Sequence, residues 1–160
     1  MKPLRKPALD PNTVTPHSSS GYPEPYRSRV LPRVKRRLGN ALGLTKIGVN
    51  LTTLPPGKES AMRHWHTHED ELVYILEGEV MLRTEAGEQP LRAGMCAGFP
   101  AGHADGHQLV NRSAHPALYL EISNRATAED TAHYSDPDVD MVWNAPQARG
   151  RFARRDGSPF

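Results

Sequence analysis

Residues 57–71 read GKESAMRHWHTHEDE, and this stretch decides both the fold and the candidate site. Its histidines occupy alternate positions, and a run of acidic residues follows them. Side chains two positions apart project from the same face of a β-strand, so His64 and His66 are predicted to point together. Glu71 opens the next apolar run, and a short turn before it can bring its carboxylate back beside the two imidazoles.

The sequence on either side of this stretch predicts further short strands. Apolar residues alternate with smaller or polar ones, and turn signals such as Pro55-Pro56-Gly57 and Glu77-Gly78 separate the runs. No helical period interrupts residues 46–125, so the pattern indicates an all-β sandwich or barrel. The predicted strands cover 47–53, 61–66, 71–76, 79–84, 89–91, 95–99, 107–111 and 117–123.

Two imidazoles and a carboxylate form a donor set that suits a divalent ion such as Zn²⁺, Mn²⁺, Fe²⁺ or Ni²⁺. His107 lies in a later predicted strand and can close the site from across the barrel. Three or four protein ligands would leave positions open for water or substrate, as catalytic metals require. The alternative is a degenerate site without metal, because H-x-H alone is a weak signal.

These residues resemble the two motifs of the cupin superfamily. The first motif, G-x5-H-x-H-x3,4-E-x6-G, matches from Gly57 to Gly78 with a first gap one residue longer. The second, G-x5-P-x-G-x2-H-x3-N, matches from Gly94 to Asn111 with a gap before the histidine two residues longer. The resemblance implies a jelly-roll barrel, or double-stranded β-helix, with an irregular N-terminal arm. It also implies that four residues are metal ligands: His64, His66, Glu71 and His107.

Alternatives to this ligand set remain open. His68 shares the parity of the histidine pair, so His66 and His68 with Glu71 form a second combination. His103 lies with Asp105 in the longer gap of the second motif, where these residues either line the barrel mouth or belong to a loop.

Four more residues carry predictions of their own. Arg63 and Trp65 have the opposite parity to the ligands and are expected to face away from the cavity, as packing or interface residues. Asn111 is expected to hold a turn. Cys96 is expected to be a small buried residue, because a free cysteine behaves as a hydrophobe.

Charge and composition divide the 160-residue chain into three parts, predicted as an arm (1–45), a barrel (46–125) and a C-terminal extension (126–160). Residues 1–46 hold ten basic residues against two acidic ones, whereas residues 47–146 hold six against fifteen. The arm is rich in proline, and we expect it to be extended or partly disordered. The charges favour docking of the arm on the body, in the same subunit or a neighbour, over a solvated arm or one that binds nucleic acid.

The expected function is a metal-dependent enzyme acting on a small polar substrate. Sugar-phosphate isomerisation is the first hypothesis that the resemblance implies, and dioxygenase and lyase reactions are others. The alternative to an enzyme is a cupin that binds or senses a small ligand without catalysis. Cations for a phosphate group would have to come from Lys58, Arg83, Arg92, Arg112 or Arg125, and no motif singles one out.

The resemblance further implies a homodimer. A single cysteine fits a reducing, cytoplasmic location, and no apolar run is long enough to span a membrane.

Overall fold

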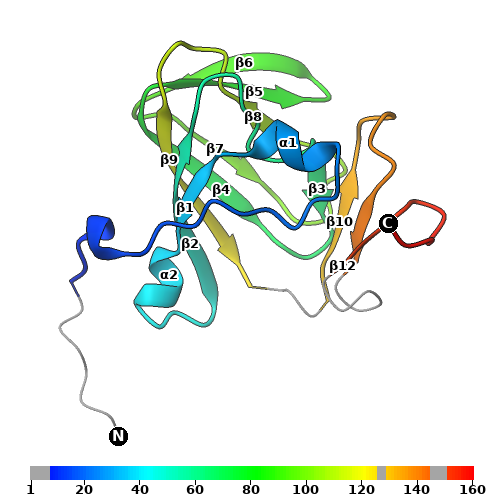
Figure 1. Ribbon diagram of the computed structural model, residues 1–160, viewed down its shortest axis with the longest axis horizontal. Coiled ribbons are helices and arrows are strands. Elements are labelled where there is room, and N and C mark those ends of the chain that lie inside the picture. Colours follow the sequence, from blue (N-terminus) through cyan, green and yellow to red (C-terminus); the bar gives the residue numbers. More distant parts are fainter. Residues whose placement is uncertain (1–7, 126–128, 145–150) are drawn as a thin grey trace, which may run out of the picture.

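A computed structural model describes residues 8–125, 129–144 and 151–160, and β-strands dominate it (Figure 1). They form three antiparallel sheets. The first, in the order β1-β2-β9-β4-β7, contains Val34–Arg36, Ile47–Leu54, Ala117–Asn124, Glu71–Glu77 and Cys96–Phe99. The second, in the order β12-β11-β10-β3, contains Arg151–Ala153, Val142–Asn144, Thr131–Tyr134 and His64–His66. The third, in the order β6-β5-β8, contains Gly87–Arg92, Glu79–Thr84 and Gln108–Val110.

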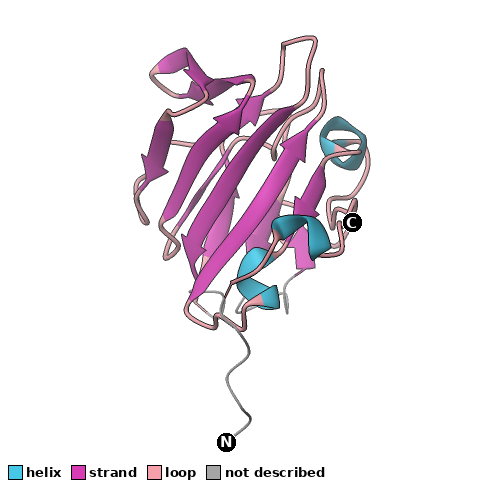
Figure 2. Ribbon diagram, turned by 90° about the vertical axis from the view of Figure 1, so that its left-hand side faces the viewer, coloured by secondary structure: helices cyan, strands magenta, loops and turns pink. Residues whose placement is uncertain are grey.

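The first sheet packs face to face against the third, and its long strands lie side by side in Figure 2. An isolated backbone bridge between His64 and His107 joins the second sheet to the third. The core between the layers holds apolar side chains from both: Leu54, Val73, Ile75, Val80, Leu82, Leu91, Leu109, Ala117 and Tyr119. The predicted all-β barrel is therefore confirmed.

Alternation in the sequence corresponds to alternation in burial, which explains why the central strands could be predicted. In β4, Val73 and Ile75 are buried while Leu72 and Tyr74 are exposed. The stretch 61–66 is a strand only from His64 to His66, and strands β10 to β12 had no counterpart in the prediction. β10 pairs with β3, so its extended form depends on a partner distant in sequence.

Gly78 makes the tight turn between β4 and β5. Its φ is +78°, and a Cβ on it would lie 3.0 Å from the carbonyl oxygen of Pro116. Glycine is required here both by the left-handed backbone and by the close approach of another segment.

The N-terminal arm packs along the body of the same chain. It contains a 3₁₀ turn at Pro11–Thr13, helix α1 at Tyr26–Val30, strand β1 and helix α2 at Leu38–Ala41. β1 adds to the edge of β2, and Arg29 pairs with Glu59 of the body at 3.0 Å. α1 lies beside the C-terminal segment in a second apolar cluster: Tyr22, Tyr26, Val30, Met62, Tyr134, Val139 and Met141. Docking of the arm on its own subunit is confirmed.

The described helices are short. None of them is long and apolar enough to cross a membrane.

Candidate metal centre

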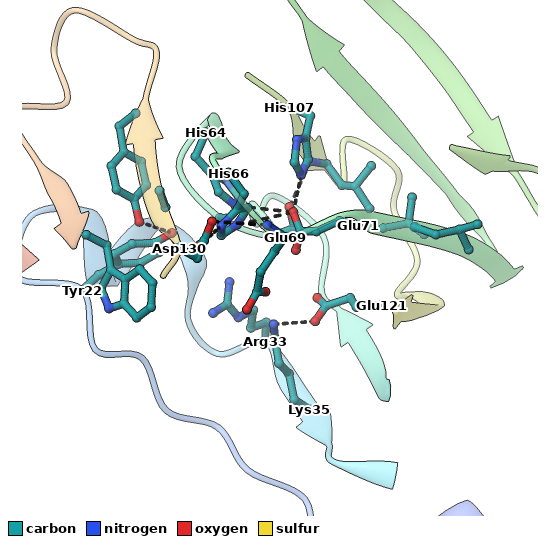
Figure 3. Close-up of a pocket in the computed structure, with 18 of the residues that line it drawn as sticks. Tyr22, Arg33, Lys35, His64, His66, Glu69, Glu71, His107, Glu121 and Asp130 are labelled. Atoms are coloured by element: carbon teal, nitrogen blue, oxygen red, sulfur yellow. Dashed lines mark hydrogen bonds and ion pairs between the residues drawn. The ribbon is translucent and has the colours of Figure 1, made fainter. Parts of the chain in front are cut away.

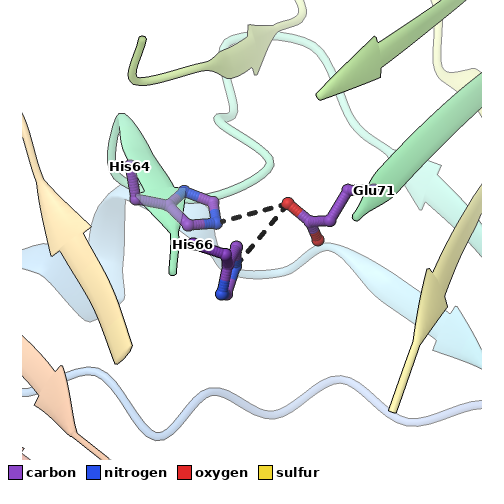
Figure 4. A group of neighbouring side chains, drawn as sticks. All are labelled: His64, His66 and Glu71. Atoms are coloured by element: carbon purple, nitrogen blue, oxygen red, sulfur yellow. Dashed lines mark ion pairs between the residues drawn. The ribbon is translucent and has the colours of Figure 1, made fainter. Parts of the chain in front are cut away.

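Strands β3 and β4 bring His64, His66 and Glu71 into one group, as the spacing predicted (Figure 4). Their ligand atoms all lie within 4.8 Å of one another. The two histidines project from the same face of β3, and the Nε2 atoms of His64 and His66 lie 3.8 and 3.6 Å from Oε2 of Glu71. Two imidazoles and a carboxylate in this arrangement can hold a divalent metal ion.

Neighbouring acceptors fix the orientation of both rings. Nδ1 of His64 lies 2.8 Å from the carbonyl oxygen of Met62, and Nδ1 of His66 lies 2.5 Å from Oδ2 of Asp130. A carbonyl or carboxylate oxygen accepts, so each Nδ1 carries the proton and donates it. In the neutral ring, each Nε2 then carries the lone pair and faces Glu71, which is the tautomer that a metal ligand needs.

The carboxylate oxygen at the centre of the group, Oε2 of Glu71, is buried and lacks a hydrogen-bond donor among the described residues. His107 places its Nε2 only 2.8 Å away, but not with the direction of a hydrogen bond. A cation held among these ring nitrogens would satisfy this oxygen. The residues present thus fit a metal ion.

Titration behaviour agrees with this donor set at His64 and Glu71. At His66, burial lowers the pKa, but the hydrogen bond to Asp130 and the charge of Glu71 outweigh it and raise this pKa, so a metal competes with a proton there. Burial, followed by the neighbouring His107, lowers the pKa of His64 to about 3, so this imidazole is neutral near pH 7. Burial alone would raise the pKa of Glu71, but His107, His64 and His66 outweigh it and hold this pKa well below the usual value. A neutral imidazole and an ionised carboxylate are the forms that bind metals.

His107, the predicted fourth ligand, lies beside the group at the start of β8. Its ring stacks on Phe99 with centroids 3.6 Å apart, and its centroid is 4.8 Å from that of His64. Nδ1 of His107 is buried and has no hydrogen-bond partner in the described part of the chain.

Comparison with known proteins assigns the family. The model of the family described as "Cupin domain" matches residues 50–123. A sugar phosphate isomerase of the cupin superfamily from Silicibacter pomeroyi is 41% identical, with 96% of each chain covered and a TM-score of 0.87.

The chain belongs to the cupin superfamily.

Two further solved structures resemble this cupin. A protein from Acidithiobacillus ferrooxidans, provisionally assigned as a sugar phosphate isomerase, is 35% identical over 69% of this chain and 68% of its own, with a TM-score of 0.63. A protein from Thermotoga maritima, predicted to be an oxalate decarboxylase, shares the fold at 20% identity, over 73% of this chain and 97% of its own, with a TM-score of 0.59. A comparison with curated proteins finds none that matches this sequence.

The alternative ligands lie elsewhere in this cupin. His68 is exposed beyond the end of β3, and its Nδ1 lies 2.8 Å from Oγ1 of Thr67. His103 and Asp105 belong to a loop and line a second cavity of about 230 Å³ that also reaches Glu71. The two interpretations given for the longer gap, loop and barrel mouth, therefore both apply.

Of the two residues of opposite parity, Arg63 lines neither cavity, whereas Trp65 lines the second cavity together with His66, Glu71 and His107. Arg63 binds Asp136 and Glu85 at 2.7 and 2.6 Å. Trp65 stacks on His133 with ring centroids 4.5 Å apart, while lining the second cavity.

Two single-residue predictions have opposite outcomes. Asn111 is fully buried, and its amide donates to the carbonyl oxygens of Leu54 and His115, so its turn-holding role is confirmed. The prediction that Cys96 is buried is wrong. This residue pairs with exposed Tyr74, and partners directly opposite on a sheet share a face, so its side chain points outward.

A cavity of about 310 Å³ opens from the metal group of this cupin (Figure 3). Its lining includes three side chains of the arm, Tyr22, Arg33 and Lys35, which sequence reasoning missed. The only available signal was the alternation of Arg33 and Lys35 around Val34, which is typical of a strand. Of the cations considered from the sequence, none lines it: Lys58, Arg83, Arg92, Arg112 and Arg125.

Glu69 and Asp130 line the same cavity and also went unpredicted. Burial raises the pKa of the Glu69 carboxyl. Asp130 is fully buried beneath His66 and accepts from the amides of His68 and Glu69 at 2.9 and 3.3 Å. Asp130 is 64 positions from His66, a separation across which no spacing rule operates.

Proposed function

We propose that this cupin is a metal-dependent isomerase of a small sugar phosphate. The observation that carries the proposal is the pair of imidazoles locked with their Nε2 lone pairs toward an orphaned carboxylate oxygen, at the wall of a polar cavity. The 41% identical cupin from Silicibacter pomeroyi, a sugar phosphate isomerase matched over 96% of both chains, supports the choice of reaction.

The proposed ligands are His64, His66, Glu71 and His107, which would hold one divalent ion, Zn²⁺, Mn²⁺, Fe²⁺ or Ni²⁺. Such an ion, when bound, polarises a carbonyl or hydroxyl oxygen as a Lewis acid. The contact between His107 and Glu71 at 2.8 Å supports including the fourth residue, because that imidazole already reaches the shared oxygen.

Glu69 is the proposed proton carrier. Isomerisation of a sugar removes a proton from the carbon beside the carbonyl and returns it to the neighbouring carbon, while a hydroxyl proton passes to the former carbonyl oxygen. The Glu69 carboxylate lies in the cavity outside the metal group, from where it can perform both transfers (Figure 3). A ligand-binding cupin without catalysis would need no such group, so Glu69 favours the enzyme over the binder.

The test combines metal analysis with an isomerase assay. Protein purified without added metal is expected to contain close to one divalent ion per chain and to interconvert an aldose phosphate and its ketose phosphate. His64→Ala and His107→Ala should lower metal content, whereas His103→Ala, a loop control, should not. Glu69→Gln should keep the metal and lose turnover. Absence of metal from the folded protein, with none taken up on addition, would refute the metal site; iron with oxygen-dependent turnover would favour a dioxygenase instead.

We also propose that the protein is a homodimer. Outward-facing apolar residues form continuous rows across the first sheet, because Val49, Ile122 and Leu72 lie opposite one another, as do Leu51, Leu120 and Tyr74. A row of this kind on an exposed sheet face suits burial against a second copy. Tyr74→Lys should yield monomers by sedimentation velocity, and Leu42→Lys, at an exposed leucine outside this sheet, should not. A wild-type protein that sediments as a monomer would contradict the proposal.

The remaining proposals concern partners and location. The expected partner is a small molecule rather than nucleic acid, since the arm directs Arg29 and Lys35 into ion pairs with Glu59 and Glu121 of the body. A cytoplasmic location is supported by a single cysteine, whose exposed thiol suits a reducing compartment.

A further inference from the structure

The arm delivers two cations to the inner face of the barrel. In β1, Lys35 lies opposite Thr52, which is fully buried, whereas Arg36 lies opposite Leu51 on the outer face. Arg33 precedes β1 with the same parity as Lys35, and both side chains line the large cavity (Figure 3). The backbone amide of Arg33 donates to the carbonyl oxygen of Val30 at 3.1 Å, which fixes it at the end of α1.

The two cations differ in what balances their charge. Nζ of Lys35 lies 2.6 Å from Oε2 of Glu121, so its charge is already matched. Nε of Arg33 is buried without a hydrogen-bond partner, and no carboxylate among the described residues forms an ion pair with this guanidinium. A buried charged donor without an acceptor is costly. Nε of Arg36 is also buried without a partner, but of the two arginines only Arg33 lines the cavity, where an anion can reach its guanidinium.

The carboxylates of the cavity do not supply this anion. Three of the four are committed elsewhere: Glu71 belongs to the proposed metal group, Asp130 binds His66, and Glu121 binds Lys35. The fourth, Glu69, is the proposed proton carrier.

We propose that Arg33 binds the phosphate group of the substrate, while the metal group receives the carbonyl end; this rests on the proposed function. The guanidinium offers a planar fork of donors that matches the oxygens of a phosphate. A cavity of about 310 Å³ accommodates a small phosphorylated sugar between the two sites. The arm is therefore part of the substrate site, and Arg33 sets specificity for an anionic substrate.

The experiment measures binding of inorganic phosphate to the full chain after chelator treatment, by titration calorimetry, so that no metal competes for the probe. Arg33→Gln is expected to weaken binding at least tenfold. Arg36→Gln is the matched control, since Arg36 lies three residues further along the arm in β1, also has a buried Nε without a partner, and lies on the outer face. It should stay within about twofold of wild type, because Arg36 does not line the cavity and a charge outside it is screened by salt.

Two more variants protect the test against misfolding. Arg33→Lys keeps the charge without the fork and should bind phosphate with intermediate affinity. Glu121→Gln removes the partner of Lys35 and should strengthen phosphate binding, a gain that a damaged fold cannot produce.

Three results would overturn the proposal: wild-type affinity in folded Arg33→Gln, an equal loss in Arg36→Gln, or acetate bound as tightly as phosphate. Phosphate binding that depends on Arg33, in a protein without isomerase activity, would instead reject the proposed function and leave the anion site standing.

Discussion

Asp130→Asn is a sharp test of how the metal group is prepared. Oδ2 of Asp130 accepts the proton of His66 Nδ1 at 2.5 Å, and Oδ1 accepts from the amide of His68 at 2.9 Å. An asparagine keeps the shape and the oxygen that faces the amide, but it presents an NH₂ group to His66. That group can only donate, so Nδ1 must lose its proton and Nε2 must gain it. His66 would then direct an N–H rather than a lone pair at Glu71.

The expected cost follows from the hydrogen bond that is lost. A hydrogen bond to a charged group contributes about 1.5–3 kcal/mol. Divided by about 1.4 kcal/mol for each tenfold change, this corresponds to roughly 10- to 100-fold weaker metal binding. The assays are a competitive metal titration against a chelating dye and nitrogen-15 NMR of the His66 ring, which should report a proton on Nδ1 in the wild type and on Nε2 in the variant.

Asp136→Asn serves as the control. Asp136 is also a buried aspartate, but it binds Arg63 at 2.7 Å on the far side of β3 from the metal group. This variant should lose stability and keep metal affinity. The reasoning is refuted if folded Asp130→Asn binds metal within about twofold of the wild type, or if both variants lose affinity equally.

Three further predictions concern stability. Gly78→Ala should lower the free energy of unfolding in urea by about 2–3 kcal/mol, since a left-handed alanine costs about 1–2 kcal/mol and its Cβ would lie 3.0 Å from backbone. Gly57→Ala has a similar φ but open space around it, so it should lose only the cost of the backbone conformation, about 1–2 kcal/mol; equal losses in the two variants would contradict this. Val30→Ala removes two fully buried methyl groups and should cost about 1.5 kcal/mol; no change would show that the arm does not dock in solution. A divalent metal at about 100 times its Kd should raise the free energy of unfolding of the wild type by about 2.7 kcal/mol, and a chelator should remove this gain. The same metal concentration should not stabilise His66→Ala.

The sequence alone was sufficient for the barrel because its central strands carry their own pattern. Val73 and Ile75 alternate with outward residues, and the turn at Gly78 needs a glycine whatever surrounds it. The histidine pair could be predicted for the same reason, since residues two apart share a face on any strand. Local periodicity therefore explains why the strands and the histidine pair were accessible, whereas the jelly-roll barrel and the full ligand set were implied by the resemblance to the cupin motifs.

What could not be predicted depends on contacts between segments far apart in the chain. The arm is rich in proline, and nothing in its own sequence shows which residues it packs against. Tyr26 and Val30 are buried in a cluster with Tyr134, Val139 and Met141. β10 has no clear strand signal of its own and takes its form from pairing with β3. Asp130 became visible only when that pairing placed it beneath His66.

The proposed metal ligands and the other residues of the cavity come from different parts of the chain. The matched cupin domain spans residues 50–123 and contains all four proposed metal ligands. Arg33 and Lys35 come from before it, and Asp130 and Tyr134 from after it, yet all four line the cavity. We therefore expect the barrel to supply the proposed metal site and the flanking segments to determine which molecule fits beside it. The match to the Silicibacter pomeroyi cupin covers 96% of both chains and so extends beyond the barrel. We expect cupins that share the arm to share a substrate class. Cupins matched in the barrel alone are expected to share only the metal-binding residues.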